Sequence, residues 1–273
     1  MYRSLRAYFR LARAALHLLH GAATVALLFP FLARARRGQL KRRWSRQLLD
    51  CLGVALEPPA GPAPAGMLVA NHISFLDIFV INAMAPAAFV AKDDVRSWPL
   101  IGWLCARTET IFIERGSRRA AQHTRERVVE HLRDDVLVTV FPEGTTGWGH
   151  EVLPFHAALL QSAIDAGVPV TPAVLRYRDD AGAPARSPAY VGDTSLVECL
   201  LAIARADGLA AGIQTLAALP SAGTDRRHLS AHAHRVIAHA LDRGTAGCNQ
   251  SGKPQFNGRR TEKTEEKPGS FLN

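Results

Sequence analysis

Short apolar runs alternate with amphipathic stretches through the middle of the chain, between residues 67 and 242. Strands are predicted at 67–70, 88–91, 108–113, 136–141, 168–175, 189–191 and 213–219. Helices are predicted at 78–85, 95–106, 117–132, 156–166, 196–206 and 226–241. The run 136–141 is almost continuously apolar, which is typical of a buried parallel strand. The alternation predicts an α/β fold with a largely parallel sheet flanked by helices.

The first 46 residues have a different pattern, with an uncharged stretch between two basic ones. Residues 15–33 carry no formal charge and are close to the lower length limit for crossing a bilayer. Four arginines before them share one face of a predicted helix, namely Arg3, Arg6, Arg10 and Arg13. Seven more basic residues follow within 34–46. We expect residues 1–46 to form a membrane-associated helix or helical hairpin whose basic sides face anionic head groups. The alternative is a buried core helix with a solvated basic flank.

Breaks in composition predict the domain boundaries. Residues 47–66 are expected to form a helix followed by a linker, because 58–66 are rich in proline and glycine. The catalytic domain is expected at 67–242. From residue 243 to 273 the chain has little apolar content, which predicts a disordered tail.

The charge of the chain narrows the class of partner. The 273 residues carry a formal net charge of +9, with a sequence pI near 9.9, which suits an anionic partner. No nucleic-acid-binding module is recognisable, so an anionic membrane surface is favoured over nucleic acid. The four cysteines form no C-x-x-C pair, and His228 and His232 lack an acidic residue at the metalloprotease position, so no disulfide framework and no metal site are predicted.

A histidine and an aspartate flank the turn after the first strand of this domain. His72 follows the run 67–70, and Asp77 stands near the start of the next predicted helix. Five positions apart on one helix they would point in different directions, but across a turn they can meet. A carboxylate that accepts the proton of one ring nitrogen leaves the other nitrogen able to take a proton from a hydroxyl. The alternative is that His72 caps a turn and Asp77 caps a helix.

Polar residues follow two further predicted strands. Arg115 lies just beyond 108–113, and Glu143 lies in a Pro/Gly turn after 136–141. Ligands of open α/β sheets bind at the carboxyl ends of the strands. We therefore expect His72, Arg115 and Glu143 to converge at one edge, with 168–173 adding an apolar wall.

At these residues the chain resembles the glycerolipid acyltransferases of the 1-acylglycerol-3-phosphate acyltransferase type. The four blocks of that family match NHISFLD at 71–77, IFIER at 111–115, FPEGT at 141–145 and VPVTP at 168–172. The resemblance covers about residues 40 to 240, and the first and third blocks are the specific ones.

The resemblance implies a role for each matching residue. His72 would be the general base on the acceptor hydroxyl, and Asp77 would orient it. Arg115, Glu143, Gly144 and Thr145 would bind the acceptor head group. The acyl donor would be acyl-CoA or acyl carrier protein, with no metal or redox cofactor, at the cytoplasmic face of the inner membrane. A thioesterase or lipid hydrolase acting on the same donors is the alternative, and a non-catalytic membrane-binding module is disfavoured by the complete set.

One position departs from the family pattern. The family commonly has arginine after Glu-Gly-Thr, where this chain has Thr146, so one bidentate phosphate partner is missing. The variant Glu-Gly-Thr-Thr-Gly followed by Val-Leu-Pro-Phe is similar to the branch that acts on lyso-ornithine lipid. Arg115 and Arg118 remain available for a phosphate. The sequence leaves two acceptors open, lysophosphatidic acid and lyso-ornithine lipid.

Overall fold

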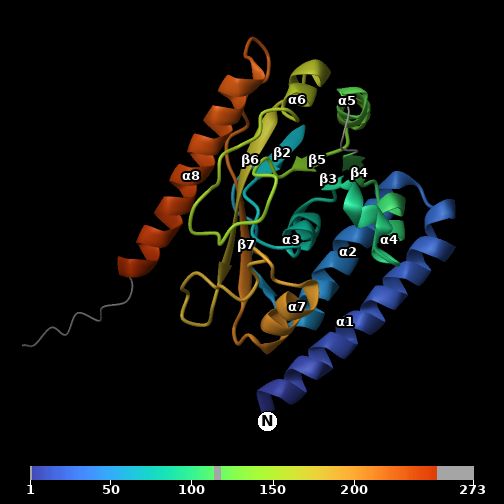
Figure 1. Cartoon of the computed structure of the whole chain (residues 1–273), viewed down its shortest axis with the longest axis vertical. Helices are drawn as coiled ribbons and strands as arrows, with labels where there is room; N and C mark the ends of the chain where they lie inside the picture. Colours follow the sequence, from blue (N-terminus) through green and yellow to red (C-terminus); the bar gives the residue numbers. More distant parts are fainter. Residues whose placement is uncertain (1, 114–117, 251–273) are drawn as a thin grey trace, which may run out of the picture.

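The computed structural model describes residues 2–113 and 118–250 and is built around a seven-stranded sheet (Figure 1). The strands are β1 (Ala55–Leu56), β2 (Met67–Ala70), β3 (Ala88–Lys92), β4 (Ile111–Ile113), β5 (Val138–Val140), β6 (Val170–Arg178) and β7 (Ala210–Thr215). The α-helices are α1 (Tyr2–Leu27), α2 (Arg34–Leu52), α3 (Asp77–Met84), α4 (Ile101–Arg107), α5 (Arg118–Arg133), α6 (Gln161–Ala166), α7 (Leu196–Arg205) and α8 (Arg226–Gln250). Two 3₁₀ turns complete the set, η1 (Phe29–Phe31) and η2 (Asp93–Ser97).

The sheet has the order β1-β7-β6-β2-β5-β3-β4 and is mostly parallel. β2 lies in the interior and pairs in parallel with β5 on one side and β6 on the other, so that Met67 is opposite both Val138 and Val170. Among the strands of the described residues, β6 and β7 form the one antiparallel pair. The predicted α/β class with a largely parallel sheet is confirmed. The carboxyl ends of β2, β3, β4, β5 and β6 therefore lie at the same edge.

Alternating side chains of the strands bury both faces of the sheet, as parallel sheets require. On β2, Leu68 and Ala70 pack with α2, α3 and α7, whereas Met67 and Val69 pack with α5, α6 and α8. Figure 1 shows the result, with α8 along one side of the sheet and the α1–α2 pair on the other. Tyr177 of β6 faces the α3 side, which places its hydroxyl under the turn that precedes α3.

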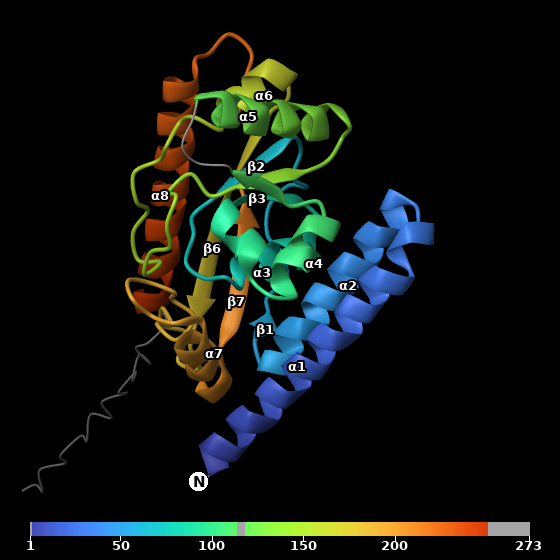
Figure 2. The same cartoon turned by 45° about the vertical axis from the view of Figure 1, so that its right-hand side comes forward.

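α1 and α2 form a helical hairpin, one of the two forms expected for residues 1–46. η1 joins the two helices, and in both views α2 lies against the domain while α1 lies outside it (Figure 2). Among the described residues, one helical stretch, Arg3–Phe31, is long and apolar enough to cross a membrane, judged by length and composition alone. It includes most of α1 and continues through η1, and 22% of its most apolar segment is buried inside the protein. Large apolar side chains on it are exposed, namely Leu5, Tyr8, Phe9, Leu16, Leu19, Leu27, Leu28 and Phe31.

Two arginines of the basic face of α1, Arg6 and Arg10, point into the protein, contrary to our expectation that this face contacts lipid head groups. Arg6 donates to the carbonyl of Arg205, and Arg10 donates to those of Ala204 and Ala206 at 3.1 and 2.8 Å. The last carbonyls of a helix have no partner within the helix, so these guanidinium groups satisfy the end of α7. Arg13 forms an ion pair with Asp50 of α2 at 2.9 Å.

The basic run on α2 is also partly used inside the protein. Arg42 and Arg46 both donate to the carbonyl of Ala83, at the end of α3. Lys41 donates to the carbonyl of Ala87 at 2.8 Å. Several basic residues thus fasten the hairpin to the domain, and its exposed apolar side chains remain available for contact outside the protein.

Several boundaries differ from the sequence prediction, including the predicted helix 156–166, which begins at Gln161, and the predicted strand 213–219, which lies at Ala210–Thr215. Residues 189–191 form a loop, because Tyr190 donates its amide to the carbonyl of Ile73 and not to a strand. The stretch 95–106 is split into η2 and α4 around Pro99, which lacks a donor and restricts the residue before it. β1 lies inside the predicted 47–66 linker segment. α8 continues to Gln250 through the start of the predicted tail, since extending a helix adds one hydrogen bond per residue without a new nucleus; residues 251–273 lie outside the described residues.

Candidate active site

The centre of the site is the turn between β2 and α3, at the carboxyl end of an interior strand. Asn71, the first residue of this turn, is buried, and its side chain pairs with the backbone of Leu175 on β6. Its Nδ2 donates to the Leu175 carbonyl at 3.1 Å, and its Oδ1 accepts from the Leu175 amide at 2.8 Å. The turn is therefore fixed to the sheet on the residue immediately before His72.

His72 and Asp77 meet across this turn. His72 Nδ1 lies 2.8 Å from Asp77 Oδ2, and since a carboxylate only accepts, Nδ1 carries the proton. The ring stacks on Phe141 with centroids 4.0 Å apart and planes 11° apart. The side chain of His72 is 21% exposed while that of Asp77 is fully buried. Within the described residues only Nδ1 of this ring is hydrogen-bonded, which leaves Nε2 as the accessible nitrogen.

Asp77 is held by three further donors. Its Oδ2 also accepts from the amides of Ile73 at 2.7 Å and Ser74 at 3.0 Å, and its Oδ1 accepts from the Tyr177 hydroxyl at 2.7 Å. Burial and the adjacent Asp77 carboxylate raise the pKa of Tyr177 well above its ordinary value, so the phenol stays protonated and donates. Sequence analysis missed Tyr177, because one tyrosine in an apolar strand a hundred residues away carries no local signal.

Glu143 is buried under the same turn. Its Oε1 accepts from the His72 amide at 2.8 Å, and its Oε2 accepts from the Leu153 amide at 3.0 Å. Burial raises the pKa of Glu143, and the two amide hydrogen bonds oppose that rise. The carboxylate therefore braces the backbone of His72 against the loop that ends near Leu153. Contact with an acceptor head group stays a prediction for Glu143.

The loop after Glu143 runs along the other side of the histidine. Gly144 has a φ of +69°, a left-handed conformation that favours glycine, and it is exposed together with Thr145. Gly147 donates its amide to the carbonyl of His72 at 2.8 Å, and the Thr146 hydroxyl donates to the carbonyl of Tyr190. The roles of Gly144 and Thr145 in binding stay predictions, and both residues directly follow Glu143, which accepts from the His72 amide.

Arg115 and its neighbours 114–117 lie outside the described residues, so the expected convergence of Arg115 with His72 stays a prediction. The strand that leads to it can be placed. β4 is the edge strand, separated from β2 by β5 and β3. Three strand spacings put β4 roughly 14 Å from β2.

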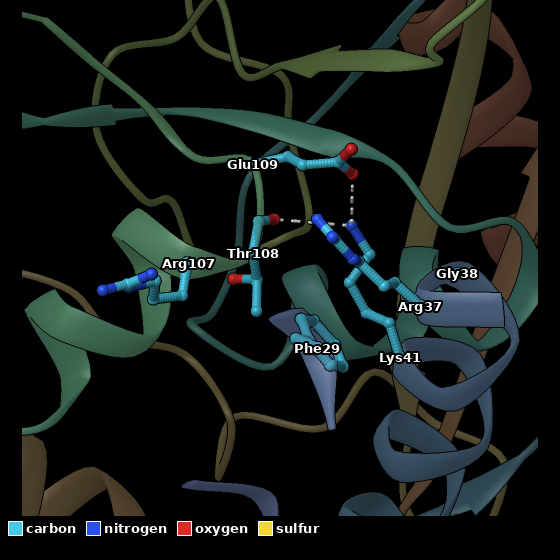
Figure 3. A pocket seen from close by; sticks show the side chains of 7 residues that line it. All are labelled: Phe29, Arg37, Gly38, Lys41, Arg107, Thr108 and Glu109. Atoms are coloured by element: carbon cyan, nitrogen blue, oxygen red, sulfur yellow. Dashed lines mark hydrogen bonds and ion pairs between the residues drawn. The ribbon is translucent and has the colours of Figure 1, made fainter. Parts of the chain in front are cut away.

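A small pocket between the hairpin and the domain is too small for a substrate. Figure 3 shows it, lined by Phe29, Arg37, Gly38, Lys41, Arg107, Thr108 and Glu109. Its volume is about 20 Å³, which accommodates roughly one water molecule. Lys41 fills one wall, with Nζ 3.4 Å from Glu109 Oε2, and Arg34 Nε donates to Glu109 Oε1 at 2.8 Å. The cluster joins α2 to the segment before β4. No group of three metal-ligating side chains occurs among the described residues.

Comparison with known proteins places this geometry in a family. The Acyltransferase family model matches residues 59–176, which contain the whole turn and Glu143. A lyso-ornithine lipid O-acyltransferase of Pseudomonas aeruginosa is 37% identical over 217 residues, covering 79% of this chain and 83% of that protein. A 1-acyl-sn-glycerol-3-phosphate acyltransferase of Neisseria meningitidis serogroup B is 44% identical over 158 residues, covering 57% and 62%.

A solved structure supports the fold independently. The crystal structure of the 1-acyl-sn-glycerophosphate (LPA) acyltransferase from Thermotoga maritima matches with a TM-score of 0.64 and 20% identity, covering 89% of this chain and 95% of that one. The similarity of fold, the family model and the Pseudomonas aeruginosa relative aligned over most of its length all indicate the same family. The chain therefore belongs to the acyltransferase family.

Proposed function

We propose that this protein is a membrane-associated O-acyltransferase that moves a fatty acyl group from acyl-CoA or acyl carrier protein to the free hydroxyl of a lysolipid. The product would be phosphatidic acid from lysophosphatidic acid, or ornithine lipid from lyso-ornithine lipid. The observation that carries the proposal is the 2.8 Å hydrogen bond from His72 Nδ1 to the buried Asp77, which leaves Nε2 as the accessible nitrogen. The names of the relatives supply the class of acceptor.

The proposed reaction is direct transfer. His72 Nε2 takes the proton of the acceptor hydroxyl as its oxygen attacks the thioester carbonyl carbon. The new C–O bond forms, the C–S bond breaks, and the thiolate leaves with the proton that the imidazolium returns. Asp77 fixes the ring tautomer and stabilises the transient imidazolium. A thioester is already activated, so no metal or redox cofactor is required, and transfer should persist in EDTA.

We further propose that the protein sits on the cytoplasmic face of the inner membrane through the α1–α2 hairpin. The exposed apolar side chains of α1 support this, because soluble monomers rarely expose a contiguous apolar face of this kind. Both proposed donors are soluble thioesters of the cytoplasm, and the acceptor is a lipid, so the two meet at that surface.

The test is acyl transfer by the purified full-length protein in detergent, with labelled acyl-CoA and labelled acyl carrier protein as donors. Lysophosphatidic acid and lyso-ornithine lipid are offered separately, and the His72→Ala variant is the control. Labelled diacyl product that the variant does not form supports the proposal. Labelled free fatty acid with no acceptor requirement would replace it with a thioesterase or hydrolase.

A further inference from the structure

We propose that a groove beside the catalytic turn binds a zwitterionic amino-acid head group, with Arg186 facing its carboxylate and Asp193 and Glu198 facing its ammonium. This inference rests on the proposed function, decides between its two acceptors in favour of the ornithine-type lysolipid, and replaces the head-group contacts that the family resemblance implies for Arg115, Glu143, Gly144 and Thr145. A phosphate monoester is the acceptor chemistry that it disfavours.

The groove is wide and open to solvent, and its lining mixes apolar and charged side chains. It has a volume of about 590 Å³, within the range of about 300–1,000 Å³ that is typical of small-molecule pockets. Trp148 forms one wall, Arg186 lies over its ring at 6.0 Å from the centroid, and the buried Ala189 and Cys199 form part of the lining. Asp193 and Glu198 line it on the side of α7.

Two segments that line the groove are held by hydrogen bonds to or beside the turn between β2 and α3. Trp148 directly follows Gly147, whose amide bonds the carbonyl of His72. Tyr190 donates its amide to the carbonyl of Ile73 at 3.0 Å and accepts the Thr146 hydroxyl. The groove is therefore formed by α7 together with the two segments that contact residues 72 and 73. A lysolipid carries its free hydroxyl a few bonds from its head group, and we infer that a head group held here lets that hydroxyl reach His72.

The charges of the groove suit a zwitterion and not a phosphate. Arg186 is the one cation among its lining residues, against two carboxylates. The loop 142–149 contributes no lysine or arginine. Glu198 accepts hydrogen bonds from the amide and hydroxyl of Ser195, which lower its pKa and keep it ionised. A phosphate monoester would meet two like charges for each opposite one, whereas an amino-acid head group offers a carboxylate to Arg186 and an ammonium to the acids.

The test compares the two acceptors across charge variants of the groove. Arg186→Ala removes the carboxylate partner, and Asp193→Lys removes an ammonium partner and adds a phosphate partner. Arg235→Ala on α8 is the matched control, since it removes an exposed arginine outside the groove. The readout is kcat/KM for each lysolipid with the same labelled donor, together with the Tm of each variant.

The wild-type protein is expected to prefer lyso-ornithine lipid. Arg186→Ala should lower kcat/KM for it by about tenfold through KM, and Asp193→Lys should shift the ratio of the two acceptors at least tenfold toward lysophosphatidic acid. Arg235→Ala should leave the ratio unchanged. A wild-type preference for lysophosphatidic acid, or a ratio unmoved by both groove variants at unchanged Tm, overturns the groove assignment while the transfer reaction stands. Transfer to neither lysolipid overturns the proposed function, and the groove assignment with it.

Discussion

Tyr177 and Asp77 stand a hundred residues apart in the chain, and the Tyr177 hydroxyl donates a 2.7 Å hydrogen bond to Asp77 Oδ1. The strand β6 brings this hydroxyl beneath the turn after β2, because β6 and β2 pair in parallel with Ala70 opposite Ala173. The aspartate thus has His72 on one oxygen and Tyr177 on the other. We regard Tyr177 as a positioning residue that fixes the carboxylate on which His72 depends.

We expect Tyr177→Phe to lower kcat by about tenfold and to leave the KM of both substrates unchanged. A hydrogen bond to an ionised group contributes about 1.5–3 kcal/mol, and about 1.4 kcal/mol of barrier is tenfold in rate. Steady-state kinetics with labelled acyl donor measure both constants. Tyr8→Phe, at an exposed position on α1, is the control for loss of a hydroxyl. Wild-type kcat in a folded Tyr177→Phe protein would contradict the role of Tyr177.

Glu143→Gln separates a bracing role from a binding role. The glutamine oxygen can still accept from the His72 amide, but its NH₂ group then faces the Leu153 amide, which is also a donor. The free energy of unfolding should therefore fall by about 1–3 kcal/mol. If Glu143 acts only as a brace, kcat falls with little change in the KM for the lysolipid. A large rise in that KM with unchanged unfolding would instead show that Glu143 contacts the head group. Urea unfolding and steady-state kinetics on the same preparation decide between the two.

The attachment of the hairpin should depend on pH through Glu109. Burial alone would raise the pKa of Glu109, but the hydrogen bonds and charges of Arg34 and Lys41 outweigh it, so the pKa lies below its ordinary value of 4.5. A carboxyl group whose pKa is lowered on folding contributes stability above the unfolded pKa and loses it as the pH falls through the folded pKa. The ion pair is therefore fully present at neutral pH.

The Tm difference between wild type and Glu109→Gln measures this contribution. We expect a constant difference from pH 8 to pH 5, corresponding to about 1–2 kcal/mol, and a smaller one as the pH falls below 4.5. A difference that grows on acidification would contradict the sign. The buried ammonium of Lys41, 11% exposed, is the group left without its carboxylate in the variant.

The exposed apolar face of α1 should control binding to membranes. Leu16 and Leu19 are 69% and 59% exposed, so Leu16→Glu/Leu19→Glu disturbs no buried packing. We expect it to reduce partitioning onto lipid vesicles by about tenfold or more while transfer in detergent persists. Ala121→Glu/Ala231→Glu adds the same two charges at exposed positions on α5 and α8 and should bind vesicles as the wild type does. Equal loss in both double variants would indicate a simple charge effect.

The α/β class and most of its elements could be predicted from the sequence, because both follow from local pattern. The run at β5 is apolar on both faces, and the predicted strand 67–70 coincides with β2. The pairing of β7 antiparallel to β6 could not be predicted, since register and direction depend on contacts distant in the chain. The prediction that Arg6 and Arg10 face lipid head groups was wrong for the same reason. The end of α7 to which they donate is about two hundred residues away in the chain.

The candidate site was partly visible in the sequence. His72 and Asp77 lie in one short motif, so their meeting across a turn could be inferred from spacing alone. The inward carboxylate of Glu143 and the hydroxyl of Tyr177 could not, because hydrogen bonds between distant strands and loops leave no local pattern. The groove of Trp148 and Arg186 joins two loops that only the folded chain brings together.

The most direct test of the catalytic proposal is the rate of acyl transfer by His72→Ala beside the wild-type protein. Labelled acyl thioester and lysolipid are supplied at saturation, and the Tm of each protein confirms that both are folded. We expect labelled diacyl lipid from the wild type and a rate lower by roughly 10³-fold or more in the variant, since the general base is then lost and Asp77 has no imidazole to orient. Transfer by a folded His72→Ala protein at the wild-type rate would contradict it.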